Sequence, residues 1–100
     1  MPAKMVALFT KPEDVEAFEK HYNEVHAPLV KKMPNLDRLE VTRFIGAPVG
    51  EPRYYLMAEM YFKDKATMFA SAGSEEGMAC GKDAFIMSNK TVHMMFATVE

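Results

Sequence analysis

A histidine on the apolar side of a helical pattern is the residue of this sequence best suited to chemistry. In the segment FEKHYNEVHAPLVKKMPN (residues 18–35), His26 stands one helical turn after Tyr22 and two residues before Pro28. An unperturbed imidazole titrates at about pH 6.5, so it gives or takes a proton under cellular conditions. Partly apolar surroundings would lower its pKa and favour the neutral base. The sequence therefore predicts His26 as a general acid or base, although the ring could instead bond a backbone carbonyl freed by Pro28.

Six further side chains are candidates for binding a substrate, because they stand beside His26 or on strand-like segments that could line a cavity. Tyr22 could orient the imidazole or hydrogen-bond a substrate, or it could be an ordinary core residue. Glu59 and Arg43 are expected on the same sheet face, where they would bind a polar substrate or form an ion pair that satisfies only itself. His93 would lie at a cavity mouth or simply at a strand end. The full candidate set is Tyr22, Arg43, Tyr55, Glu59, Tyr61 and His93.

The sequence predicts no metal, haem or nucleotide site. His21 and His26 are five residues apart, which is about 140° around an α-helix, so their rings should not converge on a metal. The sequence contains neither an H-E-x-x-H motif nor a cysteine cluster. In GMACGKD three residues rather than four separate the glycines, and Asp83 stands where a phosphate-binding loop needs Ser or Thr. We therefore expect chemistry without a cofactor or a metal.

Length and composition indicate a single domain over residues 1–100. The sequence is 49% hydrophobic with a net charge of −2, which suits neither a disordered chain nor a nucleic-acid-binding protein. It has no apolar run of the roughly 20 residues that span a bilayer, and its first residues do not resemble a signal peptide. Cys80 is the only cysteine, so no internal disulfide is possible. We expect a cytoplasmic protein that binds neither nucleic acid nor membrane.

Apolar periodicity predicts the element order β, α, β, β, α, β. Strands are expected over residues 4–10, 36–46, 53–62 and 91–100, and helical segments over about 11–32 and 65–85. Thr10 and Glu13 have the spacing of a capping box at the start of the first helix, and Asp64 is a plausible cap for the second. The pattern indicates an α+β, ferredoxin-like fold, in which four antiparallel strands carry the helices on one face.

The second face of this sheet would be left bare and partly apolar. Residues 91–100 are apolar on both faces of their strand, which a lone two-layer subunit would expose to water. A second copy of the chain is expected to cover this face in a homodimer and to enclose a cavity between the two sheets. We expect His26 to face that cavity. Ten methionines, which fill irregular apolar space, suit a core or such a cavity.

The element order and the helix motif F-x-x-x-Y-x-x-x-H-x-P-L (Phe18 to Leu29) resemble the EthD family of dimeric α/β barrel proteins. The resemblance extends from about Met5 to Val99. Proteins of that family include an accessory protein of alkyl-ether degradation that works beside a cytochrome P450 system, and fungal enzymes that dehydrate or decarboxylate aromatic polyketides. The resemblance implies a cofactor-free enzyme or accessory protein of a degradative or oxidative pathway, with His26 as acid/base and a small apolar, oxygenated or aromatic substrate. The alternative is a non-catalytic protein that binds or carries such a molecule.

Overall fold

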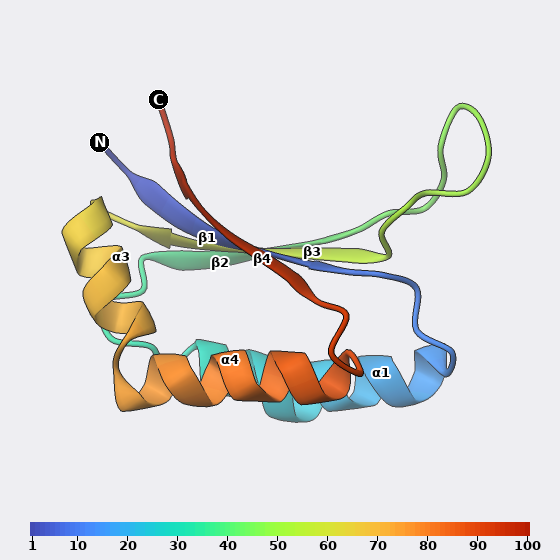
Figure 1. Ribbon diagram of the computed structural model, residues 1–100, viewed down its shortest axis with the longest axis horizontal. Coiled ribbons are helices and arrows are strands. Elements are labelled where there is room, and N and C mark those ends of the chain that lie inside the picture. The colour runs from blue at the N-terminus through green and yellow to red at the C-terminus, as the bar shows by residue number, and fades with distance from the viewer.

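Four antiparallel strands form one sheet in the order β2-β3-β1-β4 in the computed structural model, which describes residues 1–100 (Figure 1). The strands are β1 (Ala3–Phe9), β2 (Arg38–Arg43), β3 (Leu56–Phe62) and β4 (His93–Thr98). The helical elements are α1 (Val15–His21), η1 (Tyr22–His26), α2 (Ala27–Val30), α3 (Lys65–Ala72) and α4 (Glu75–Met87). In Figure 1 the helices lie on one side of the sheet, so the predicted ferredoxin-like α+β fold is confirmed. None of the helices is long and apolar enough to cross a membrane.

The core lies between the sheet and the helices. Along β1 the buried residues alternate with partly exposed ones. The β3 residues that pair with the buried residues of β1 are buried too. Successive strand residues point to opposite faces, so one face of each strand supplies the core. Phe9 at the end of β1 packs edge-on against Phe18 of α1, with ring centroids 5.5 Å apart. The sheet residues of the core are Ala3, Met5, Ala7, Phe9, Leu56, Ala58, Met60 and Phe62.

The opposite face of the sheet carries no helix. The strand register places Val6 between Glu59 of β3 and Met95 of β4, so these three side chains share that face. Leu8 and Met57, which pair with each other, lie on it as well. The fold therefore leaves a sheet surface with apolar side chains at its centre, and we call this surface the bare face.

The first helix begins later than the capping-box prediction. The side chain of Asp14 accepts a hydrogen bond from the Ala17 amide at 3.0 Å, and helical geometry starts at Val15. The prediction of a cap at Thr10 is wrong, because an aspartate at Asp14 is a stronger N-cap than threonine and offers a later start. The cap predicted at Asp64 is confirmed by its 2.8 Å bond from the Thr67 amide.

A π-helical turn, η1, follows α1 and ends beside Pro28. The Ala27 amide donates to the Tyr22 carbonyl five residues earlier. Pro28 has no N–H and its ring would collide with the Glu24 carbonyl in a regular α-helix, so a wider turn relieves the conflict. Because residues five apart are hydrogen-bonded neighbours in a π turn, His21 and His26 come to the same side of the helix. The prediction that these two rings diverge is therefore wrong.

Candidate functional site

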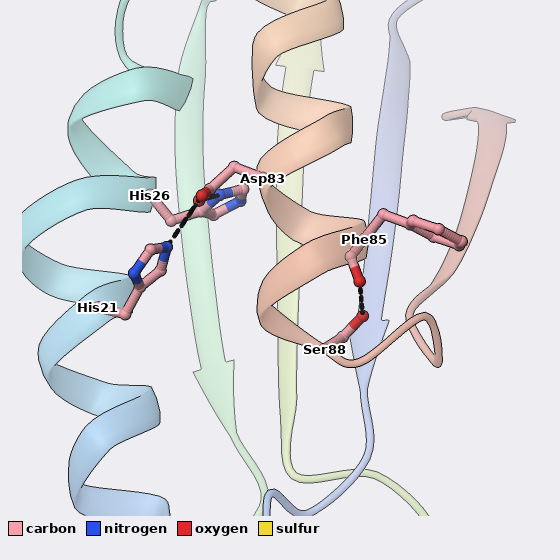
Figure 2. Close-up of polar contacts among 5 residues, drawn as sticks. All are labelled: His21, His26, Asp83, Phe85 and Ser88. Carbon is pink, nitrogen blue, oxygen red and sulfur yellow. Dashed lines mark hydrogen bonds and ion pairs between the residues drawn. The ribbon is translucent and has the colours of Figure 1, made fainter.

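Two histidines share one carboxylate between α4 and the first helical segment, which consists of α1, η1 and α2. His26 Nδ1 lies 2.8 Å from Asp83 Oδ2, and His21 Nε2 lies 2.9 Å and 3.0 Å from the two oxygens of the same side chain. Figure 2 shows both imidazoles reaching from one helical segment toward Asp83 on the neighbouring helix. We call these three residues the His–Asp–His trio. The π turn produces it, because it aligns the two histidines.

His26 has the protonation state that a general base requires. The residue is only 4% exposed, and this burial lowers the pKa of the imidazole, while the hydrogen bond and charge of Asp83 oppose the shift in part. Since an ionised carboxylate can only accept hydrogen bonds, the proton of the neutral ring belongs on Nδ1. Nε2 then carries a lone pair and makes no hydrogen bond within the protein. It is the ring nitrogen available to a ligand.

A cavity of about 200 Å³ lies on the helix side of the sheet, and His26 is part of its wall. Eleven of its fourteen lining residues are hydrophobic, and the other two besides His26 are glycines. Five of the ten methionines line it, namely Met5, Met33, Met60, Met78 and Met94. His26 is therefore the one strongly polar side chain facing an apolar space.

Tyr22 is the predicted binding residue that lies beside His26. The two rings are 5.4 Å apart between centroids, and Tyr22 is 1% exposed. Its hydroxyl has no hydrogen-bond partner, and burial raises the pKa of Tyr22 to about 12. The phenol therefore stays protonated. The charges that act on its hydroxyl are those of Arg43 and Glu19, and Tyr22 does not line the cavity that His26 faces.

Arg43 and Tyr55 form a separate cluster with Glu19 of α1. Arg43 Nη2 lies 2.7 Å from Glu19 Oε1, and the Tyr55 hydroxyl donates to Glu19 Oε2. The predicted pairing of Arg43 with Glu59 is wrong, because Arg43 lies opposite Leu56 in the register and so belongs to the helix side of the sheet. The guanidinium beside Glu19 lowers the pKa of that carboxyl. This cluster ties α1 to the sheet.

Glu59, Tyr61 and His93 lie on the bare face, away from His26. Glu59 is paired with Lys4 at 2.5 Å, and the Tyr61 hydroxyl is 3.3 Å from the same carboxylate oxygen. His93 lies opposite Leu8 in the register, and its ring packs against Tyr54 at 6.0 Å between centroids. The structure thus divides the predicted site residues between two faces of the sheet.

The predicted place of His26 in a cavity between two sheets is wrong. The apolar side of the first helical segment packs onto the sheet of its own chain, and His26 belongs to that side with Phe18 and Tyr22. The imidazole therefore faces the interior of one subunit. The cavity it lines is formed within a single chain.

Asp83 and His21 are the site residues that sequence reasoning missed. Asp83 stands in the middle of α4 between two buried residues, Cys80 and Ala84. A carboxylate so close to a buried helix face needs a partner, and this was the available signal. No group of three or more His, Cys, Asp or Glu side chains in the protein has the arrangement of a metal site.

Residues 10–85 match the family model described as the EthD domain. The chain belongs to the EthD family. An EthD-family protein from Bacillus halodurans C-125 is 41% identical, with a TM-score of 0.95 and 100% of both chains covered. An uncharacterized 11.0 kDa protein in the thcB-thcC intergenic region of Rhodococcus erythropolis is 28% identical over 97 residues, which cover 97% of this chain and 94% of that protein.

The fold is also shared with an enzyme whose sequence identity to this chain is much lower. SnoaB, a cofactor-independent oxygenase from Streptomyces nogalater, is 14% identical with a TM-score of 0.72, and the match covers 99% of this chain and 93% of that one. At this identity the likeness shows the fold alone. The EthD-family membership therefore rests on the family model and on the close relative from Bacillus halodurans.

Proposed function

We propose that this EthD-family protein is a cofactor-free enzyme that binds a small, largely apolar molecule between its helices and its sheet. The observation that carries the proposal is an imidazole with a free Nε2 in the wall of an apolar cavity, held at Nδ1 by a carboxylate. An apolar protein cavity of about 150 Å³ can bind benzene. A volume of about 200 Å³ therefore suits one substituted aromatic ring or an oxygenated molecule of similar size.

The geometry supports proton transfer by His26. Nε2 takes a proton from an O–H or an acidic C–H bond of the ligand, and the electron pair of that bond stays on the ligand. Asp83 stabilises the resulting imidazolium through the Nδ1–H hydrogen bond at 2.8 Å. Returning the proton to another atom of the ligand completes an isomerisation or assists the departure of a leaving group. Tyr22 packs against the His26 ring but does not line the cavity, so it helps to hold the imidazole in position rather than to bind the ligand.

A carrier without catalysis is the competing function, because ten of the cavity's fourteen lining residues are aliphatic or aromatic and form no hydrogen bond with a ligand. Such a protein would hold the same class of molecule, and His26 would serve as a hydrogen-bond partner only. The two functions share the cavity and differ in whether the bound molecule is chemically converted.

Blocking the cavity tests whether it is the binding site. A β-carbon at Gly81, which lines the cavity, would meet no atom within 4 Å, so Gly81→Leu should fill part of the space and leave the fold intact. Single-ring phenols, ketones and ethers would be screened by the rise in melting temperature that a bound ligand causes. We expect any ligand found in this screen to bind at least about tenfold more weakly to Gly81→Leu, because the leucine side chain would occupy part of the space that the ligand needs.

Gly46→Leu is the matched control, because a β-carbon there also meets no atom but the residue lies outside the cavity. Its ligand affinity should equal that of the wild type. Equal binding to the wild type and to both variants would place the ligand elsewhere and contradict the proposed site.

The bare face supports a homodimer with the sheets back to back. Met95 is 44% exposed on this face, and Val6, Leu8 and Met57 lie beside it. We expect the protein to sediment as a dimer and Met95→Lys to sediment as a monomer, because a charge would be buried without a partner. Ile86→Lys, 65% exposed on α4, is the control and should stay dimeric. A monomeric wild type would overturn this part of the proposal.

We further place the reaction in the cytoplasm, in a degradative or oxidative pathway. The lone cysteine fits a reducing compartment, since no internal disulfide can form. A cavity lined almost entirely by hydrophobic residues suits the hydrophobic compounds that such pathways handle.

A further inference from the structure

We propose that His21 is a positioning residue for His26. His21 hydrogen-bonds Asp83 from the solvent side and binds the first proton that the His–Asp–His trio takes up. As a result, Nε2 of His26 stays unprotonated. This inference rests on the proposed function of His26 as a base. It extends that function to a residue outside the cavity, because His21 does not line the space that His26 faces.

The two histidines differ in their access to water while sharing one partner. The side chain of His21 is 38% exposed and that of His26 is 5% exposed, with Asp83 between them at 18%. Both rings are within hydrogen-bond distance of Asp83. A charged imidazolium loses solvation when it is buried, so a proton added to the trio is favoured on His21.

The first proton then opposes a second one. With one proton added to His21, the trio has one carboxylate and one imidazolium, and its net charge is zero. Adding another proton at His26 would place two cations on one carboxylate, and the charge of His21 accordingly lowers the pKa of His26. The trio should therefore titrate as a coupled unit in which His26 is the last histidine to become charged.

Few other titratable groups face the two rings. On the side of His26, the neighbours are Tyr22 and the Cys80 thiol, and burial raises the pKa of that thiol to about 11. The strand residues around the cavity carry no titratable group. On the other side, His21 lines a surface groove of about 580 Å³, and the charged residues of this groove are Lys11, Glu13 and Asp14. Asp83 is thus the carboxylate that both histidines contact directly.

Removing His21 should make His26 easier to protonate. In His21→Gln the amide can still donate a hydrogen bond to Asp83 but cannot take up a proton. His26 would then have the carboxylate without a competing cation. We expect the titration midpoint of His26 to rise by about one pH unit. The pH below which substrate turnover falls should rise by the same amount, because protonated His26 cannot act as a base.

The test is a pH titration of the full chain, with histidine ring carbons and nitrogens observed by NMR. In the wild type, the His21 resonances should shift at higher pH than those of His26, while His93 on the bare face serves as the internal reference. In His21→Gln the midpoint of His26 should rise and that of His93 should not change. Protonation of His26 before His21 in the wild type, or an unchanged or lower His26 midpoint in a folded His21→Gln, would overturn the inference.

The titration needs no ligand, so it is separable from the proposed function. If His21→Gln shifts the His26 midpoint but His26→Ala leaves turnover unaffected, the trio behaves as inferred and the catalytic assignment fails. If His26→Ala abolishes turnover but the midpoint does not move, His26 is catalytic and the role of His21 is wrong.

Discussion

The His26→Ala variant is expected to turn over its substrate about 10²- to 10⁴-fold more slowly than the wild type, which is the usual contribution of a positioned general acid or base. The loss should fall on kcat, because the apolar wall of the cavity provides most of the contact with the ligand. Ligand affinity measured by calorimetry should therefore change by less than about tenfold. The assay is steady-state turnover of a ligand found in the thermal screen.

His93→Ala is the matched control for this variant. It removes the same side chain from the bare face, where the ring packs on Tyr54 and is remote from Asp83. Its turnover should equal that of the wild type. Unchanged turnover in a folded His26→Ala would reject the acid/base role of His26. Ligand binding without any turnover by the wild type would favour the carrier function.

The Gly77→Ala variant is expected to lose about 3 kcal/mol or more of unfolding free energy, at the upper end of the effect of overpacking. A β-carbon at Gly77 would lie 2.1 Å from the Ser71 carbonyl oxygen and 2.6 Å from that of Ala72. Both atoms belong to the backbone of α3, so no side chain can move aside to make room. Helices α3 and α4 would have to separate, and the core against Met68 would loosen.

Gly81→Ala on the same helix provides the comparison. Its β-carbon would meet nothing within 4 Å, so only helix propensity changes, which favours alanine by about 1 kcal/mol. In urea unfolding, the midpoint concentration of Gly77→Ala should therefore be lower than that of the wild type, and that of Gly81→Ala should be higher. Equal stability of Gly77→Ala and Gly81→Ala would contradict the close contact between α3 and α4.

The fold was predictable because its signals are local. Alternating residues in β1 and β3 define a buried face at the period of a strand, and Asp64 is a cap that works through its own neighbours. These features need no knowledge of which elements meet. His26 could be found in the same way, because its place beside Tyr22 on the apolar side of a helix depends on spacing alone.

The rest of the site depends on contacts between elements. Asp83 meets His26 only because α4 packs beside the first helical segment, and His21 joins them only because the turn before Pro28 is a π turn. The supposed pair of Arg43 with Glu59 failed for a related reason. Matching the faces of two strands requires the register, and a shift of one residue places a side chain on the other face of the sheet.

A crystal structure of the protein with a ligand from the thermal screen determines most directly where the ligand binds. We expect the ligand between the helices and the sheet, in contact with Met5 and Met60, with an oxygen or an acidic carbon next to His26 Nε2. A ligand found between the bare faces of two subunits, or in the groove beside His21, would contradict the proposed site.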